Sequence, residues 1–182
     1  MPTPIMGPAS APFATVEAYA KREMTARAIT SNWYLKALDA LWIQASRCGV
    51  DPVVAAAQCG HETGFGKFGR AVTPDHGNTA GIKVRSVPPG SADDDPDIHA
   101  RFAIDPYGRP LVGALAHVHH LMLYAGVHVS LDTPDPRAVW IWPGTSNYGA
   151  APTVEALSGK WAPATDYGTR VAALVRRLRG ES

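Results

Sequence analysis

The sequence predicts one mostly helical domain of the α+β class, on three observations. Apolar residues recur at helical spacing before residue 64 and again after residue 110. Between them, residues 67–104 lose this periodicity and are rich in Gly, Pro and Asp, with short β-branched runs. The length of 182 residues fits one domain comfortably. We therefore expect a flexible leader at 1–12 and a single domain at 13–182, with a small irregular β-lobe at about 67–104.

Local signals place the helices before residue 64. The stretch 15–30 is compatible with a helix, and 31–49 carries apolar residues at helical spacing and ends at a glycine. Asp51 followed by Pro52 marks the next start, because Asp accepts a free backbone N–H and Pro loses no bond at the first helical position. The apolar segment that follows should be a buried helix that Gly64 stops.

The second half of the chain predicts two further long helices. Residues 111–124 are almost wholly apolar, and residues from about 165 to 178 place apolar side chains on one face. Residues 131–152 are a connection rich in Pro, Trp and Gly with at most a short helix, and 153–157 form another short helix.

Composition excludes several classes of protein. Hydrophobic residues make up 46% of the chain and charged residues 18%, which is typical of a globular core. A net charge of +1 argues against a dedicated nucleic-acid binder. No apolar run reaches the ~18 residues of a membrane span. We expect a monomer with neither nucleic acid nor membrane among its partners.

Glu62 is the candidate catalytic acid. It closes an apolar helix one step before a glycine-rich turn and shares a face with Ala55 and Cys59. Partial withdrawal from water should raise the pKa of its carboxyl group. A glutamic acid still protonated near neutral pH can donate to a glycosidic oxygen. Phe65 and Phe68, just beyond it, offer flat surfaces for sugar rings, with a place in the core as the alternative for each.

Three segments resemble a known family, the family-73 glucosaminidases. Residues 57–67 (AQCGHETGFGK) are similar to its A-Q-x-x-x-E-[ST]-G-x-G-[KR] signature, and residues 76–83 (HGNTAGIK) to its N-N-x-x-G-I-K segment. Residues 161–168 (WAPATDYG) resemble its late Y-A-x-D-x-x-Y element, with Trp161 where the tyrosine usually stands. The matches occur in the family's order and cover residues 50–178.

This resemblance implies a lysozyme-like fold, in which a helical lobe and a β-lobe flank a glycan cleft. It implies an endo-β-N-acetylglucosaminidase that cleaves bacterial peptidoglycan strands with Glu62 as general acid, needing no cofactor or metal; an N-acetylmuramidase is the neighbouring alternative. Tyr167 is the candidate auxiliary tyrosine, and Tyr148 is the other. Side chains expected to bind the substrate are Phe65, Asn78, Tyr148 and Trp161.

The second carboxylate is left open. The resembling family often takes it from the β-lobe, where the acidic run 93–97 offers Asp95 and Asp97. Four clustered carboxylates repel one another, so at most one of them should be catalytic. Asp105 is a further candidate, although it looks more like a helix cap. The substrate's own N-acetyl group is the alternative to any second acid.

Two other functions compete with glycan cleavage. A cysteine peptidase would use Cys59 with His61 or a distant histidine, but Cys59 lies late in its helix, away from the end that stabilises a thiolate. A noncatalytic module would use Glu62 only to hydrogen-bond sugar. A zinc protease of the H-E-x-x-H type would need a histidine where Gly66 stands, so the histidines of 117–120 are expected to be structural or surface residues and not metal ligands.

The amino terminus shows neither a basic region nor an apolar core of a secretory signal. For a cell-wall hydrolase, this predicts a phage endolysin. It would be made in the host cytoplasm and would act at the cell wall after release through a holin or carriage in a phage particle. A cell-wall-binding domain elsewhere in a longer protein would fit this expectation.

Overall fold

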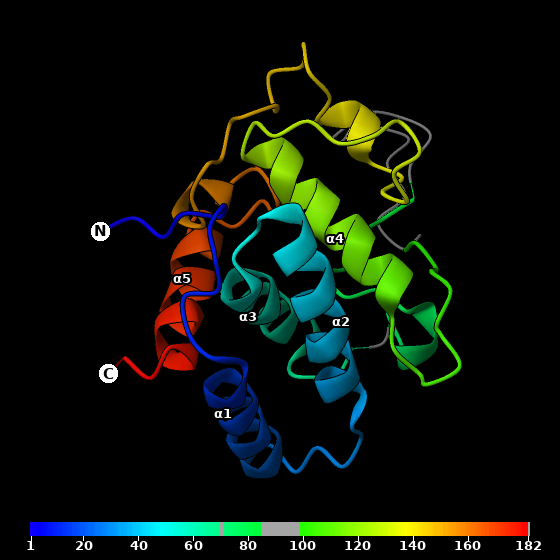
Figure 1. The fold of residues 1–182 in the computed structure, drawn as a ribbon, viewed down its shortest axis with the longest axis vertical. Helices are drawn as coiled ribbons and strands as arrows, with labels where there is room; N and C mark the ends of the chain where they lie inside the picture. Colours follow the sequence, from blue (N-terminus) through cyan, green and yellow to red (C-terminus); the bar gives the residue numbers. More distant parts are fainter. Residues whose placement is uncertain (70, 85–98, 182) are drawn as a thin grey trace.

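The computed structural model describes residues 1–69, 71–84 and 99–181. Within these ranges the chain is mostly helical, as predicted (Figure 1). The elements, in order, are α1 (Phe13–Ala26), α2 (Trp33–Cys48), α3 (Pro52–Thr63), η1 (Pro74–His76), α4 (Leu111–Tyr124), η2 (Ala138–Trp140), η3 (Glu155–Leu157) and α5 (Tyr167–Leu178). No helix in the described ranges is long and apolar enough to cross a membrane.

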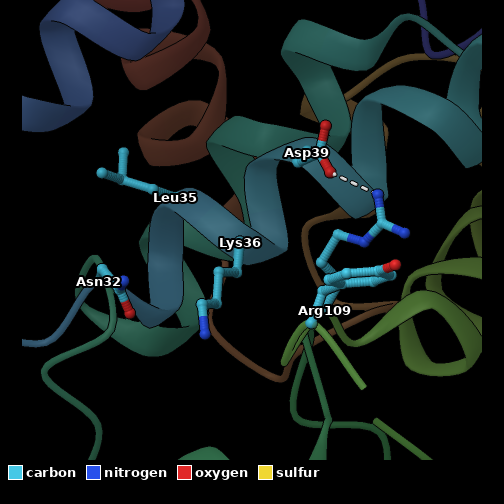
Figure 2. Close-up of a pocket in the computed structure, with 6 residues that line it drawn as sticks. Asn32, Leu35, Lys36, Asp39 and Arg109 are labelled. Carbon is cyan, nitrogen blue, oxygen red and sulfur yellow. Dashed lines mark hydrogen bonds and ion pairs between the residues drawn. The ribbon is translucent and has the colours of Figure 1, made fainter. Parts of the chain in front are cut away.

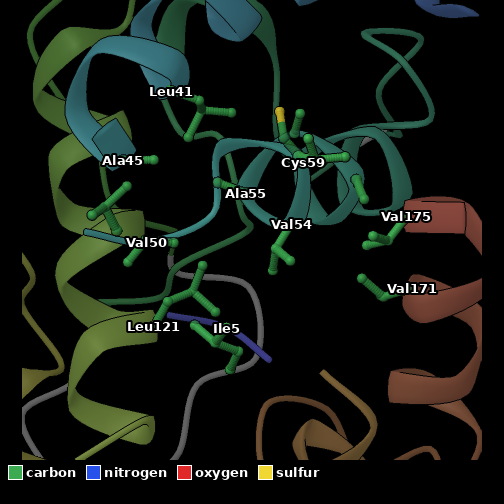
Figure 3. Packing of buried hydrophobic residues seen from close by; sticks show 14 of the residues in the cluster. Ile5, Leu41, Ala45, Val50, Val54, Ala55, Cys59, Leu121, Val171 and Val175 are labelled. Carbon is green, nitrogen blue, oxygen red and sulfur yellow. The ribbon is translucent and has the colours of Figure 1, made fainter. Parts of the chain in front are cut away.

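Helix α3 lies at the centre of the fold. It packs against α2 on one side and α5 on the other, while α4 covers α2, and α1 contacts both α2 and α5 (Figure 1). Nearly every residue of α3 is buried, and its small side chains allow its neighbours to approach closely. Side chains of α2, α3, α4 and α5 meet in one apolar cluster (Figure 3). The side chains in the last turn of α3 are therefore held in place by a tightly packed core.

The sequence signals at the ends of α2 and α3 act as predicted. The side chain of Asp51 accepts a hydrogen bond of 2.9 Å from the backbone N–H of Val53, and Pro52 occupies the first turn. Gly49 ends α2 and Gly64 ends α3, both in the left-handed conformation that glycine adopts without strain. Helix α3 thus has a fixed start and a fixed end.

The expected flexible leader is corrected by the structure. Ile5 is fully buried in the main apolar cluster (Figure 3). Its N–H donates to the carbonyl of Pro152 at 3.1 Å, and its carbonyl accepts from the N–H of Asp51 at 2.9 Å. The prolines of this segment suit the extended backbone that makes such bonds at an edge. Residues 3–11 therefore belong to the fold.

Only part of the expected β-lobe falls within the described residues. In 67–69, 71–84 and 99–104 no continuous strand forms, and one isolated antiparallel bridge joins Lys83 to His99. The buried side-chain amide of Asn78 holds this part together. It hydrogen-bonds backbone groups of Ala80 and Ile82 within the loop and the carbonyl of Ala100. The described backbone there is irregular, and the β-lobe stays a prediction.

Candidate active site

Glu62 lies in the last turn of α3, partly buried at the edge of the core. Removal from water raises the pKa of its carboxyl group, because burial penalises the charged form. The hydrogen bond from Tyr167 and the polar side chain of Trp161 act in the opposite direction, since both favour the ionised carboxylate. The environment thus holds a proton on Glu62 more tightly than water would, while supplying donors for the charge that follows proton loss.

The carboxyl group of Glu62 reaches an open cleft of about 410 Å³. The end of α3 forms one wall and the loop 78–83 forms the other, with residues 161–163 closing it. Gly81 stands directly opposite, so that a side chain on it would begin 3.6 Å from Oε2 of Glu62. Lys83 and His99 also line the cleft. Among its described lining residues Glu62 is the only carboxylate.

Tyr167 supports Glu62 from the protein side. Its hydroxyl donates to Oε1 of Glu62 at 2.5 Å and accepts from Nε2 of Gln58 at 2.8 Å. The ring is only 3% exposed and does not line the cleft, so the tyrosine expected to be catalytic contacts the acid rather than the cleft. Burial raises the pKa of its hydroxyl group well above the ordinary value, with the negative charge of Glu62 adding to the effect.

A close backbone contact sets the position of Tyr167. It is the first residue of α5, and the next residue, Gly168, lies against the turn at 154–155. A β-carbon on Gly168 would come within 2.3 Å of the Val154 carbonyl oxygen, so only glycine fits. The N–H of Gly168 donates to the Ser158 hydroxyl at 2.9 Å. The close packing of Gly168 on this turn places the start of α5 beside the end of α3.

Two buried residues that the sequence analysis did not select complete the polar interior. Gln58, on α3, is fully buried, and its Oε1 lies 2.8 Å from Nε2 of His117 on α4. Nδ1 of His117 lies 3.2 Å from the hydroxyl of Thr79. Burial lowers the pKa of His117 to about 3, so its ring is neutral at physiological pH. The available signal was Gln58 itself, an amide in an otherwise apolar helix, which needs buried partners.

Trp161 lines the cleft, where it was expected to bind substrate. Its ring packs edge-on against His120 with 4.6 Å between centroids, and it also contacts His117 and Tyr124. His120 is held in turn by Asp135, whose buried carboxylate lies 2.7 Å from its Nδ1. The indole is therefore held by ring contacts within the protein, while another part of it lines the cleft.

Asn78 lines the cleft but has no capacity left for a substrate. Its Nδ2 donates to the carbonyls of Ile82 (2.8 Å) and Ala100 (3.1 Å), and its Oδ1 accepts from the N–H groups of Ala80 (3.2 Å) and Ile82 (3.0 Å). The side chain is fully buried. The expected substrate-binding role is corrected to one of shaping the loop that faces Glu62.

Two aromatic residues expected to bind sugar lie elsewhere. Phe65 is 1% exposed and packs on Tyr34 at 4.9 Å between ring centroids. Its backbone has a positive φ of 61°, which turns the ring back into the core beside Gly60. Tyr148 donates its hydroxyl hydrogen to the carbonyl of Gly126 at 2.7 Å and is not among the cleft residues. Both assignments are corrected, because both side chains have structural partners.

Of the candidates for the second carboxylate, only Asp105 lies within the described residues. Asp95 and Asp97 lie outside those residues. Asp105 caps a turn, accepting from the N–H groups of Tyr107 and Arg109, and pairs with the Arg109 guanidinium at 2.8 Å. It does not line the cleft.

The described structure gives little support to a cysteine peptidase that uses Cys59 or to metal ligation by the histidines of 117–120. Cys59 is fully buried, and burial raises the pKa of its thiol far above the range in which a thiolate nucleophile forms. Each histidine of 117–120 has a local partner: His117 bonds Gln58, His119 bonds Thr133 and His120 bonds Asp135. Over the described ranges, no group of three His, Cys, Asp or Glu side chains is arranged to hold a metal ion.

A second hollow, of about 480 Å³, lies on the outer face of α2 beside residues 107–109 (Figure 2). Two of its charged residues are paired with each other, because Arg109 donates to Asp39 at 3.1 Å, while Lys36 also lines it. The Asp39 carboxylate is 44% exposed and well hydrated. We therefore place the candidate active site at Glu62, where an acid is withdrawn from water.

Comparison with known proteins leaves the site to be judged on its own geometry. No protein-family model, no curated protein and no solved structure matches this chain.

Proposed function

We propose that this protein hydrolyses the glycan strands of bacterial peptidoglycan as an endo-β-N-acetylglucosaminidase, with Glu62 as general acid. One observation carries the proposal. The Glu62 carboxyl group is withdrawn from water, accepts a bond from Tyr167 on Oε1 and presents Oε2 toward an open cleft. A carboxyl group in that setting is suited to donating a proton to an oxygen in the cleft.

The reaction follows from this geometry. Glu62 transfers its proton from Oε2 to the glycosidic oxygen while the bond from that oxygen to the anomeric carbon breaks, and the electron pair leaves with the oxygen as an alcohol. The electron-poor anomeric carbon is then captured by water, or by the carbonyl oxygen of the substrate's acetamido group followed by water. The water keeps one hydrogen in the new hydroxyl group and releases the other as a proton. That proton returns to Glu62 in the acetamido route, whereas in the other route the second carboxylate takes it and Glu62 regains a proton from solvent. The hydroxyl of Tyr167 already donates to the carboxylate formed in the first step.

The cleft suits a polar substrate with flat faces. Trp161 and Phe68 are aromatic residues of its lining, and Lys83 and His99 are among its polar lining residues. The choice of an amino-sugar polymer rests on the resemblance of residues 57–67 and 76–83 to the family-73 glucosaminidases. A peptidoglycan hydrolase released from a phage-infected cell, acting as a monomer at the cell wall, is the biological setting that we propose.

The nature of the second group is part of the proposal. Glu62 is the sole carboxylate among the cleft residues that the structure describes. Two routes remain: a base from the acidic run 93–97, with Asp95 and Asp97 as candidates, or capture by the acetamido group. The stereochemistry of the product separates them, because direct attack by water inverts the anomeric carbon and acetamido capture retains it.

The decisive experiment compares Glu62→Gln with the wild type on purified cell walls. We expect the variant to fold and to lose at least ~100-fold in rate, because Gln has no acidic proton to donate. Glu17→Gln, on the exposed face of α1 where Glu17 pairs with Lys21, is the matched control and should keep full rate. A folded Glu62→Gln variant with near-normal activity would falsify the proposal.

The products define the bond that is cleaved. Borohydride reduction followed by mass spectrometry marks the sugar at the new reducing end, which we expect to be N-acetylglucosamine. A reduced N-acetylmuramic acid end would make the enzyme a muramidase instead. If the wild type binds cell walls but releases no reducing ends, the protein is a glycan-binding module and the proposed enzyme activity is wrong.

A further inference from the structure

The side chains behind Glu62 form a continuous buried line of hydrogen bonds, here called the inner chain: Tyr167, Gln58, His117 and Thr79. Its members come from α5, α3, α4 and the loop opposite Glu62. Gln58, His117 and Thr79 are fully buried and Tyr167 is 3% exposed. Successive heavy-atom distances from Glu62 outward are 2.5, 2.8, 2.8 and 3.2 Å. Bulk water does not reach such groups, so each must find its partners within the protein.

The inner chain has a direction. The Gln58 amide nitrogen donates to the Tyr167 oxygen, which leaves the single tyrosine hydrogen for Oε1 of Glu62. The Gln58 amide oxygen can only accept, so Nε2 of His117 must carry a hydrogen. A neutral imidazole has one such hydrogen, and Nδ1 therefore accepts from the Thr79 hydroxyl. Every donor thus points toward Glu62.

The opposite direction has a different chemical consequence. If the Gln58 amide were turned over, its oxygen would take the tyrosine hydrogen and its nitrogen would donate to His117. The His117 hydrogen would then move to Nδ1, with Thr79 donating to the carbonyl of Gly113, 3.4 Å away. Tyr167 could no longer donate to Glu62, and a protonated Glu62 would have to donate to Tyr167. Its proton would face the interior instead of the cleft.

We propose that the inner chain is a positioning device, in which the Nε2–H form of His117 orients Gln58 and Tyr167 so that the proton of Glu62 stays on Oε2, facing the cleft. This inference rests on the proposed role of Glu62 as acid. His117 and Gln58 touch no substrate and act through Tyr167. Because the last donor points at the oxygen pair that becomes charged, the same arrangement stabilises Glu62 after proton transfer.

Several other titratable groups surround the two ends of the inner chain. Around Glu62 they are His61 and Cys59 on α3, and Lys83 and His99 across the cleft. Arg170 of α5 acts on Tyr167, and His120 of α4 acts on His117. Each of these stays in place in the variants below, so a change in the titration of Glu62 reports the inner chain.

The first test needs no variant. Ring ¹⁵N shifts of His117 in the folded wild-type protein at pH 7 should show a protonated Nε2 and an unprotonated Nδ1. A protonated Nδ1 would mean that the line runs away from Glu62, and it would overturn the proposal.

The second test follows the ¹³C resonance of the Glu62 carboxyl group as pH changes. Tyr167→Phe and His117→Leu should both raise the midpoint, because each weakens the donor to Oε1. His117→Gln should keep a midpoint close to the wild type, since its amide places a donor near the position of Nε2. His119→Gln, on the same helix but bonded to Thr133, is the matched control and should change nothing. Equal midpoints for His117→Leu and the wild type would overturn the proposal.

Kinetics on cell walls give the third readout. In His117→Leu, kcat should fall about tenfold, the change that one hydrogen bond makes to a rate, and the alkaline limb of kcat/KM should move to higher pH. His117→Gln should restore both. If kcat falls but the alkaline limb of the kcat/KM profile stays at the same pH, the role of His117 is only structural and the proposal is overturned. If the wild type cleaves no cell wall while the titrations behave as expected, the proposed function fails and the inner chain stands.

Discussion

The hydroxyl of Tyr167 donates a hydrogen bond of 2.5 Å to the carboxyl group of Glu62, although 105 positions separate the two residues in sequence. Tyr167 starts α5 and Glu62 ends α3, so this bond joins the two helices at the edge of the cleft. It leaves one carboxyl oxygen engaged with the protein and the other facing the cleft. The two oxygens of Glu62 are therefore chemically distinct before any substrate binds.

Glu62→Gln should stabilise the fold at high pH. The pKa of Glu62 is raised in the folded protein, so the folded state holds this proton more tightly than the unfolded chain does. Stability is then lost as pH rises from the ordinary glutamate pKa through the folded one. Gln does not ionise and avoids that loss. Thermal melts should show equal stability near pH 3 and a higher Tm for the variant at pH 8; a lower Tm at pH 8 would contradict the burial of this carboxyl group.

His117 should make the fold sensitive to acid. Burial lowers its pKa to about 3, whereas the unfolded residue titrates near its ordinary value of 6.5. Between these values the unfolded chain binds a proton that the folded protein does not, so stability falls as pH falls, by at most about 1.4 kcal/mol per pH unit. His117→Gln should flatten the curve of unfolding free energy in this window. Parallel curves for the two proteins would show that the ring is protonated in the fold.

Gly168→Ala should destabilise the protein by about 2 kcal/mol or more, because its β-carbon would meet the Val154 carbonyl oxygen at 2.3 Å. For a chain of this size the loss corresponds to a Tm lower by about 4–8 °C. Gly69→Ala, where an added β-carbon meets nothing within 4 Å, is the control and should stay within about 0.5 kcal/mol of the wild type. A tolerated Gly168→Ala would show that α5 can shift without cost.

Trp161→Ala should weaken glycan binding roughly tenfold through loss of an aromatic surface in the cleft. Trp161→Phe keeps a flat ring but removes the indole N–H that favours the ionised form of Glu62. The Phe variant should therefore bind nearly normally and show a higher pKa for Glu62. Calorimetry with soluble glycan fragments and carboxyl titration measure the two effects separately. Equal binding by the wild type and the Ala variant would remove Trp161 from the substrate site.

Ile5→Ala should cost about 2–5 kcal/mol, the usual range for emptying a fully buried aliphatic site. Ala9→Ser, on the exposed part of the same segment, should be nearly neutral. Denaturant titration compares the two. A neutral Ile5→Ala would restore the interpretation of residues 1–12 as a flexible leader.

The parts of the fold that could be predicted from sequence depend on neighbouring residues. Asp51 and Pro52 start a helix through local backbone bonds, and Gly49 and Gly64 end helices through their own conformations. Glu62 could be selected in the same way, because an acid at the end of an apolar helix is already unusual.

The remaining features depend on contacts that no local pattern reports. Tyr167 is paired with Glu62 only because α5 sits against α3, and His117 meets Gln58 only because α4 and α3 share an interior. For Phe65 the alternative of a place in the core holds, because its positive φ turns the ring inward although its position beside the motif favours a surface role. The burial of Ile5 was missed because a proline-rich composition hides the few apolar residues of this segment that join the core.

The docking of residues 3–7 has a consequence for biosynthesis. The partners of this segment are the backbone at residues 49–51 and at 152–154. A ribosome makes the amino end first, so this segment waits for its second partner until most of the chain has been translated. Contacts between such distant positions also slow folding, since a large loop must close before they form. A polypeptide fused ahead of Thr3 would therefore be attached to a segment that is made early but docks late.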